Sequence, residues 1–245
     1  MKLVVKIPTR ERGLSFVNRY IDNLTNLNTI IWLTLDADEW ADIDHQQIAE
    51  EIGFPNSLNV LYTIGKTESK IHAYNRDIDL ITERFDWDIM MVGSDDMWPE
   101  QKGFDQMIID DMNKHFPDSD GCLWYNTEDS ETELKSRFNG ANIKFGTERW
   151  KRNWICMLPI VGRKYYNRFG YIYHPSYKSF WCDNEFTHVA RKMEKIQPVN
   201  RTCIQHQHPS WGAGQPKDSL YIKNNSNWQA DQSNFQERRI KGFAK

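Results

Sequence analysis

The sequence predicts an α/β fold with a Rossmann-like, mainly parallel central sheet flanked by helices. Short apolar runs without helical spacing are typical of buried strands, and they occupy residues 3–8, 29–36, 58–65 and 88–96. Amphipathic stretches lie between them, near residues 14–27, 44–52 and 69–85. Strands that alternate with helices of this length form right-handed βαβ units, and such units build parallel sheets.

The stretch over 69–85 predicts the clearest helix. Its apolar residues recur three and four positions apart, on one buried face: Ile71, Tyr74, Ile78, Ile81 and Phe85. After Asp96 the pattern is less regular. We expect helices at 103–115 and 183–195, a strand at 121–126, an exposed loop or hairpin at 127–139, and further elements at 155–162 and 200–206. Residues from 212 onward are rich in Asn, Gln, Ser and Lys, which favours a mobile segment or an appended helix over core.

The composition of the chain limits the classes of protein to which it can belong. The chain has 245 residues and a formal net charge of -3, which argues against nucleic acid as the main partner because phosphate backbones select a basic surface. No apolar run reaches membrane-spanning length, and residues 1–9 lack the apolar core of a signal peptide, so we expect a cytoplasmic protein without a membrane span. The four cysteines form no CxxC pair, so reduced and mostly buried thiols are expected.

Adjacent carboxylates follow the fourth predicted strand. Its apolar residues end abruptly in Ser94, Asp95 and Asp96, which places both carboxylates at the carboxyl edge of the sheet. Open α/β sheets bind ligands at that edge. Neighbouring carboxylates repel each other, so a protein that keeps them there usually holds a cation such as Mg²⁺ or Mn²⁺. The alternative is an ordinary polar turn, since Ser and Asp are common turn residues.

Three further features point to a nucleoside diphosphate. The loop after the first strand carries Arg10 and Arg12, whose guanidinium groups match phosphate oxygens. Asp36 ends the second strand, where its carboxylate could accept from a ribose hydroxyl or a base imide. Polar residues near the start of the third helix, close to the positive end of its dipole, are Lys70, Asn75 and Arg76. Taken singly, these features also fit a solvated loop, a helix cap and the polar face of an amphipathic helix.

The second half supplies candidates for proton transfer. Asp183 and Glu185 follow the aromatic pair Phe180 and Trp181 and lead into a predicted helix. Apolar rings disfavour the charged form of a carboxyl group, which moves its pKa toward the range of a general base. The alternative roles are a helix cap for Asp183 and a solvated helix charge for Glu185.

Two histidines end the last predicted strand. His206 and His208 lie two positions apart, so both imidazoles share one face of that strand, which is a metal-ligand arrangement. A hydrogen-bonded, non-ligating histidine is the alternative for each.

The motifs, in this order, resemble glycosyltransferases of the GT-A fold, most closely the family 2 type that transfers a sugar from a nucleotide diphosphate donor with inversion. The matching motifs are PTRERG (8–13), LDAD (35–38), KIHAYNRD (70–77), GSDDM (93–97), WCDNEF (181–186) and HQH (206–208). The resemblance implies one GT-A domain over 1–211, with a nucleotide-binding half at 1–98 and an acceptor and catalytic half at 99–211 that adds a smaller sheet. Residues 212–245 would then form a tail or helix, with a mobile lid as one option.

By this likeness, Mn²⁺ or Mg²⁺ bridges the phosphates of a nucleotide sugar, with a UDP-sugar favoured, and the acceptor is a carbohydrate or another hydroxyl compound. The donor would contact Pro8, Thr9, Arg10, Arg12, Asp36, Lys70, Asn75, Arg76 and Asp95. The metal would bind Asp96, with His208 or Asp95 as further ligands. Asp183 would be the catalytic base. The substrate would also contact Trp98, Trp181, Trp211 and His206.

The chain departs from the family pattern in two motifs. It has Ser94-Asp95-Asp96 in place of three acidic residues or an Asp-x-Asp, so either carboxylate can be the metal ligand. The second motif reads Asp-Asn-Glu in place of a Glu-Asp pair, so Glu185 stays an alternative base. Three other functions use similar residues: a nucleotidyltransferase, a metal-dependent phosphoesterase and a non-catalytic carbohydrate-binding protein. The first would be favoured by a glycine-rich phosphate loop after the first strand, and we find none there.

Overall fold

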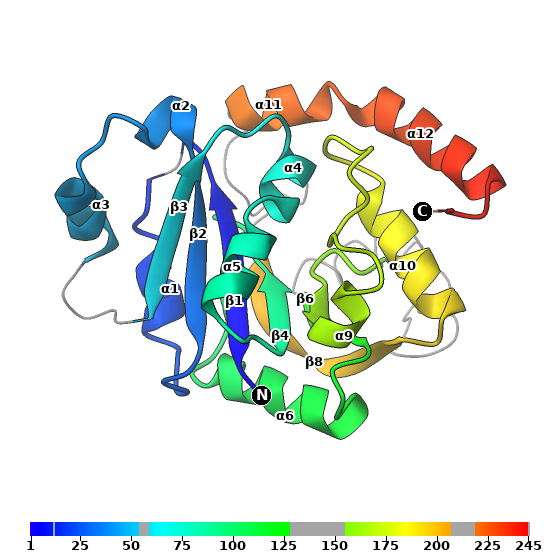
Figure 1. The fold of residues 1–245 in the computed structure, drawn as a ribbon, viewed down its shortest axis with the longest axis horizontal. Helices are drawn as coiled ribbons and strands as arrows, with labels where there is room; N and C mark the ends of the chain where they lie inside the picture. Colours follow the sequence, from blue (N-terminus) through cyan, green and yellow to red (C-terminus); the bar gives the residue numbers. More distant parts are fainter. Residues whose placement is uncertain (12, 54–58, 128–154, 207–218, 245) are drawn as a thin grey trace, which may run out of the picture.

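The computed structural model describes residues 1–11, 13–53, 59–127, 155–206 and 219–244, which form an eight-stranded mixed sheet flanked by helices (Figure 1). The strands are β1 (Leu3–Thr9), β2 (Ile30–Asp36), β3 (Val60–Gly65), β4 (Ile89–Val92), β5 (Met97–Pro99), β6 (Cys122–Thr127), β7 (Ile160–Gly162) and β8 (Ile196–His206). Their order in the sheet is β3-β2-β1-β4-β7-β6-β8-β5. The α/β prediction is therefore confirmed.

The first four strands form the parallel half of the sheet. β1 pairs in parallel with β2 and β4, and β2 pairs in parallel with β3. Each of these strands lies within the apolar run that predicted it, apart from one residue of β1. Their carboxyl ends meet at one edge of the sheet, which is the upper edge in Figure 1.

The second half of the chain continues the same sheet. β7 pairs antiparallel with β4 and with β6, β6 pairs in parallel with β8, and β5 pairs antiparallel with β8. The smaller sheet expected on the acceptor side is thus joined edge to edge to the parallel half. Although β5 follows β4 directly in the sequence, β7, β6 and β8 lie between them in the sheet.

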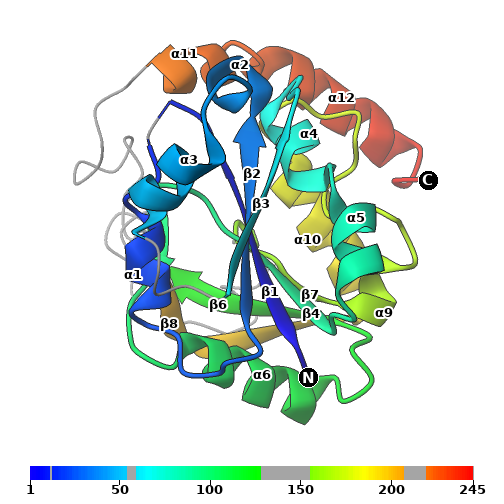
Figure 2. The same cartoon turned by 60° about the vertical axis from the view of Figure 1, so that its left-hand side comes forward.

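Helices cover both faces of the sheet. They are α1 (Val17–Ile21), α2 (Ala37–Trp40), α3 (His45–Ile52), α4 (Lys70–Asn75), α5 (Ile78–Arg84), α6 (Phe104–His115), α9 (Arg163–Tyr166), α10 (Cys182–Lys192), α11 (Ser219–Asn225) and α12 (Trp228–Ile240). Figure 2 shows α1 and α3 on one side of the parallel strands and α4 and α5 on the other. Among these described helices, none combines the length and the apolar character needed to cross a membrane.

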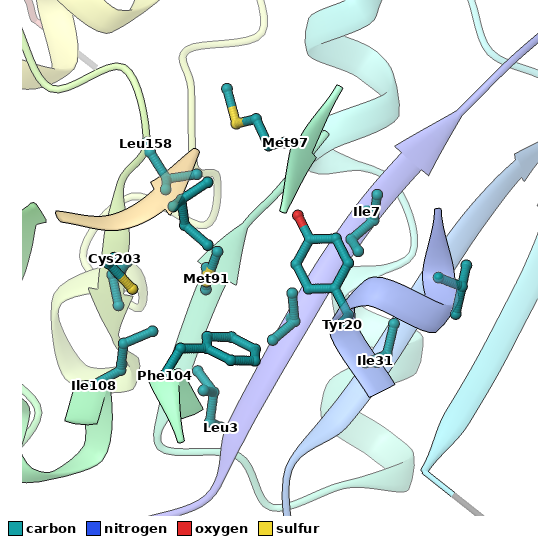
Figure 3. Close-up of a cluster of buried hydrophobic side chains, with 14 of the residues drawn as sticks. Leu3, Ile7, Tyr20, Ile31, Met91, Met97, Phe104, Ile108, Leu158 and Cys203 are labelled. Atoms are coloured by element: carbon teal, nitrogen blue, oxygen red, sulfur yellow. The ribbon is translucent and has the colours of Figure 1, made fainter. Parts of the chain in front are cut away.

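Each face of the sheet has its own apolar core. On the side of α1 and α6, Leu3 and Met91 pack with Phe104 (Figure 3). On the side of α4 and α5, Ile71 and Ile81 are fully buried with the aromatic residues that follow β7. The four cysteines are buried and form no disulfide, as predicted.

The single helix predicted over 69–85 is two helices, α4 and α5, separated by Arg76 and Asp77. Asp77 has a left-handed backbone, with φ of 66°. The Arg76 guanidinium donates to the carbonyl of Leu35 at 2.6 Å and to the Asp77 carboxylate at 2.8 Å. It lies so close to Gly65 that a Cβ there would collide with it. Contacts with the ends of β2 and β3 therefore break a helix that local periodicity predicts as continuous.

Other boundaries also differ from the prediction. α1 covers only part of the expected 14–27, and only the last three residues of 155–162 form a strand, whereas α3, α6 and α10 are where the sequence placed them. Of the loop expected at 127–139, the structure describes only Thr127, which ends β6. α11 and α12 account for residues 219–225 and 228–240, and they run along the carboxyl edge of the sheet and over α10 in both views.

Lys6 places a cation inside the protein, in the middle of β1. Its ammonium donates to Thr34 Oγ1 and to the carbonyl oxygen of Ala73, both at 2.8 Å. Burial disfavours the charge and lowers the pKa of Lys6 to about 7, although the nearby Asp77 carboxylate opposes this shift. Below that pH the fold must accommodate a buried charge.

We expect Lys6→Met to alter how stability depends on pH. An unfolded lysine titrates near a pKa of about 10.4, so between there and about 7 the unfolded state binds more protons than the folded state. This group therefore makes wild-type stability rise with pH by up to about 1.4 kcal/mol per unit across that window. In urea unfolding from pH 6 to 10, the stability of the variant relative to wild type should be greatest near pH 7 and below, and should fall toward pH 10.

The exposed Lys2 offers a matched control for this measurement. Lys2→Met should leave the pH dependence of stability unchanged. A difference between Lys6→Met and wild type that stays constant from pH 6 to 10 would contradict the shifted pKa.

Candidate functional site

The carboxyl edge of the parallel strands gathers most of the described residues that the sequence singled out. Asp95 and Asp96 lie in the turn between β4 and β5, which is closed by a hydrogen bond from the amide of Met97 to the carbonyl of Ser94. Thr9, the last residue of β1, donates its hydroxyl to Asp95 at 3.2 Å. Both carboxylates are half-buried. The segment is thus a polar turn whose carboxylates face the ligand-binding edge of an α/β sheet.

Arg10 connects the ends of β1 and β2. Its guanidinium donates to Asp36 and to Asp38, each at 3.2 Å. Asp36 in turn caps α2 by accepting from the amide of Asp38 at 3.1 Å. Pro8 precedes this pair in β1, and Arg12 lies outside the described residues. A guanidinium and a capping carboxylate therefore meet beside the acidic turn.

Lys70 interacts with acidic groups from two distant parts of the chain. It is the first residue of α4 and is exposed to solvent, so a ligand can reach it. Tyr74 raises the pKa of Lys70 most, and the carboxylates of Asp96 and Asp183 raise it further. The ammonium is therefore positive at neutral pH and interacts with the acidic turn and with the start of α10.

Asp183 occupies the first turn of α10. Trp181, two residues earlier, is the N-cap of that helix and has a left-handed backbone with φ of 64°. Asp183 is half-buried, and one of its oxygens accepts from the amide of Asn184 at 2.9 Å. Burial raises the pKa of Asp183, while Asn184 and the charge of Lys70 oppose that shift. An accessible carboxylate with a raised pKa is suited to accept a proton.

Glu185, the alternative base, has a different environment. Arg238 of α12 donates to both of its oxygens, at 2.8 and 2.7 Å, and the Tyr177 hydroxyl donates at 2.7 Å. Its side chain is only 6% exposed. These bonds join α10 to α12 and leave Asp183 as the more accessible carboxylate of the pair.

The acidic turn also approaches a histidine. His206 Nε2, at the end of β8, lies 3.8 Å from Asp96. Carboxylates and an imidazole suit Mn²⁺ or Mg²⁺, but no three His, Cys, Asp or Glu side chains of the described residues form a metal-binding group. A divalent cation here would complete its coordination with ligand phosphates and water, as Mg²⁺ commonly does. His208 lies outside the described residues.

Two of the three predicted substrate tryptophans are packed against the protein. Arg19 stacks over the Trp98 ring at 4.4 Å, and Trp98 donates to Gln205 at 3.2 Å. The Trp181 ring contacts Trp228 and Phe235 of α12, with centroids 5.5 and 5.3 Å away. Trp211 lies outside the described residues.

The hydrogen bonds of Asn75 and Arg76 are made to residues outside the acidic turn. Asn75 donates to the carbonyl of Tyr173 and accepts from the amides of Ile172 and Tyr173. Arg76 is bonded to β2 and to Asp77, as described above. Both side chains therefore join elements of the fold, while Lys70 is the member of this motif that interacts with the site.

The sequence did not single out Tyr20, which lies beside the acidic turn. Its hydroxyl points toward the strand that carries Met97 (Figure 3). Burial raises its pKa well above the usual value, and Asp96 and Asp95 add to that effect. An aromatic residue in an amphipathic helix carries no sequence signal that separates it from core, so only the fold shows this position.

No family model matches the chain, and no curated protein matches its sequence. Solved structures do match in fold. GalNAc-T7 with UDP, GalNAc and Mn²⁺ matches 98% of the chain with a TM-score of 0.59 and 14% identity. TarS of S. aureus matches 84% with a TM-score of 0.55 and 14% identity. A mannosyltransferase from Pyrobaculum calidifontis, PcManGT in complex with GDP-Man and Mn²⁺, matches 86% with a TM-score of 0.55 and 11% identity.

The chain has the GT-A fold. At these identities the likeness establishes the fold alone, and it confirms the architecture that the motif order implied. The matched region is 50% of GalNAc-T7, 36% of TarS and 58% of PcManGT. In the GT-A fold of this chain, the acidic turn after β4 and the carboxylate at the start of α10 both interact with Lys70.

We expect Arg238→Met to lower the free energy of unfolding by roughly 3 kcal/mol, because it leaves the buried Glu185 carboxylate without its cation. Chemical denaturation measures this change. The double variant Glu185→Leu with Arg238→Met should be less destabilised than Arg238→Met alone, since the orphaned charge is gone. Arg239→Met, at an exposed position of the same helix, is the control and should change stability little. Equal losses for Arg238→Met and Arg239→Met would contradict a stabilising ion pair.

Proposed function

We propose that the chain is a metal-dependent, inverting glycosyltransferase that uses a nucleotide diphosphate sugar, with a UDP-sugar favoured. The observation on which this proposal depends is that, in a GT-A fold, the Lys70 ammonium interacts with the carboxylates of both Asp96 and Asp183. Solved neighbours with this fold support the ligand class: TarS has been crystallised with UDP-GlcNAc, and PcManGT with GDP-Man and Mn²⁺.

The residues of the parallel half would bind the donor. Thr9, Arg10 and Asp36 lie where β1 and β2 end, which is the edge at which α/β sheets bind ligands. Arg10 supplies a fork of donors for phosphate or carboxylate oxygens. Asp95, held by Thr9, would face the ribose or the donor sugar. Residues 1–98 thus form the proposed nucleotide-binding half and 99–211 the acceptor half.

Asp96 would hold Mn²⁺ or Mg²⁺ together with Asp95, its neighbour in the chain, or His206, which lies 3.8 Å away. His208 stays a further proposed ligand. Such a cation offsets the negative charge of a departing diphosphate. Lys70, which interacts with Asp183, would contribute a second positive charge to offset that of the diphosphate.

Asp183 would act as the base. It removes the proton from an acceptor hydroxyl, and the oxygen forms a bond to the anomeric carbon of the donor. The bond between that carbon and the diphosphate breaks, and the diphosphate leaves with the electron pair from the opposite face. The proton stays on Asp183, and the configuration at the anomeric carbon is inverted.

We expect Asp96→Asn to weaken metal-dependent donor binding at least tenfold, because it removes a charged oxygen ligand. Calorimetry with a UDP-sugar, with and without Mn²⁺, measures this change. Asp110→Asn is the control, since Asp110 is an exposed carboxylate on α6. Unchanged Mn²⁺-dependent affinity in Asp96→Asn would exclude Asp96 as a metal ligand.

For Asp183→Asn we expect a loss of kcat between about 100-fold and 10,000-fold, with donor affinity preserved. The base acts only when it is deprotonated, and burial raises its pKa. The wild-type rate should therefore fall with decreasing pH at a midpoint above the usual value of about 3.9 for aspartate. That acidic limb should be missing from the residual activity of Asp183→Asn. A variant that keeps the same limb would rule Asp183 out as the titrating base.

A thermal-shift screen of nucleotide sugars, with Mn²⁺ or with a chelator, tests the proposed function as a whole. Binding to the native state raises the unfolding temperature by mass action. One donor should stabilise the protein in Mn²⁺ and lose that effect with chelator, and incubation should release the nucleoside diphosphate. Release of phosphate from generic esters would instead indicate a phosphoesterase. Production of a nucleotide sugar from a sugar phosphate and a nucleoside triphosphate would indicate a nucleotidyltransferase.

A further inference from the structure

Asp231 is a buried carboxylate on α12 that binds a loop far away in the sequence. It is 2% exposed. Its oxygens accept hydrogen bonds from three consecutive backbone amides, those of Lys178 at 2.9 Å, Ser179 at 2.8 Å and Phe180 at 2.8 Å. Hydrogen bonds from amides to a charged acceptor are stronger than those between neutral groups. The carboxylate therefore fixes the path of this loop.

The loop held by Asp231 leads into the helix of the proposed base and contacts the helix that begins with Lys70. Trp181 follows it with a left-handed backbone and starts α10, so Asp183 lies three residues beyond Phe180. The carbonyl of Lys178 accepts from the amide of Ile71, next to Lys70 in the first turn of α4. One short loop thus contacts the helix of the base and the helix of the cation.

α12 is itself anchored on either side of this contact. Trp228, at its start, lies against Phe180 with ring centroids 4.9 Å apart. Near its other end, Arg238 forms the buried ion pair with Glu185 of α10. Figure 1 shows α12 lying along α10. Because the helix is held at both ends, the Asp231 carboxylate has a defined position relative to the loop.

We propose that Asp231 is a positioning residue that places Asp183 and Lys70 relative to each other through the loop 178–180. This inference rests on the proposed function, since it assigns Asp183 the role of base. Asp231 touches neither the acceptor nor the reacting atoms.

The expected effect follows from geometry. A base must lie within hydrogen-bond reach of its proton, and a misplacement of about 1 Å can cost roughly 100-fold in rate. Asp231→Asn keeps the size of the side chain, but it removes the charge and presents an NH₂ group toward amide donors. The loop would then lose part of its anchor while both cores of the sheet stay intact.

The test compares wild type with Asp231→Asn and with Glu237→Gln, which makes the matching change at an exposed position of α12. The assay is release of nucleoside diphosphate from the nucleotide sugar that the thermal-shift screen selects, in Mn²⁺ and with water as the acceptor. The readouts are kcat, donor affinity by calorimetry, the pH profile of kcat and the folded fraction at the assay temperature.

We expect Asp231→Asn to lower kcat at least tenfold, to keep donor affinity within about twofold, and to shift the acidic limb of kcat to lower pH. The limb shifts because a loosened loop admits water around Asp183 and reduces the burial that raises its pKa. Glu237→Gln should match wild type in all four readouts. Asp231→Glu, which retains the charged acceptor, should recover part of the lost kcat.

Each other outcome overturns the inference. It fails if Asp231→Asn retains wild-type kcat, if its kcat falls only in proportion to the folded fraction, or if the acidic limb stays in place while kcat falls. If Asp231→Asn does not fold, the same criteria apply to Asp231→Glu, whose kcat should then lie below wild type with donor affinity kept and the limb shifted. Absence of both Mn²⁺-dependent donor binding and turnover in wild type would instead contradict the proposed function, so the two failures are distinguishable.

Discussion

The balance of charge at the carboxyl edge of the sheet is the constraint on which the rest of this structure depends. A parallel sheet collects the ends of its strands in one place, and here those ends carry carboxylates that repel one another at short range. Arg10 offsets Asp36 directly, and Lys70 interacts with Asp96 and Asp183 together. The same two cations are the groups that we propose to contact the diphosphate. One arrangement therefore stabilises the folded edge and would also favour an anionic ligand there.

Much of the fold could be predicted because it depends on local patterns. Buried parallel strands need continuous apolar runs, and these are visible in the sequence. The break at Arg76 could not be predicted, because it depends on hydrogen bonds to Leu35 in another strand. The packing of Trp98 against Arg19 and of Trp181 against α12 could not be predicted either, because a sequence does not show which residues cover a tryptophan ring. The order of the motifs predicted the GT-A fold where single motifs could not.

The candidate site was predictable to the extent that it lies at strand ends. Asp95 and Asp96 follow β4 and were found by their position alone. Asp231 was not, because it is one acidic residue in a polar segment, and its importance arises only when α12 meets the loop 178–180. Glu185 is the opposite case. Its motif made it a candidate base, whereas in the structure it forms an ion pair that joins α10 to α12. The burial and the hydrogen-bond partners of each side chain distinguish Asp231 from Glu185, and sequence patterns encode neither.

The short connection between β4 and β5 has a consequence for the shape of the whole sheet. Four strand spacings separate these neighbours, or about 19 Å if the sheet were flat. The five Cα steps from Val92 to Met97 reach at most about 18 Å when fully stretched, and here they contain a closed turn. The sheet must therefore curve, so that β5 comes close enough to β4 for the acidic turn to connect them. A longer turn would allow a less curved sheet and would also move the carboxylates of the turn. The curvature of the sheet and the positions of these charges therefore depend on the same short segment.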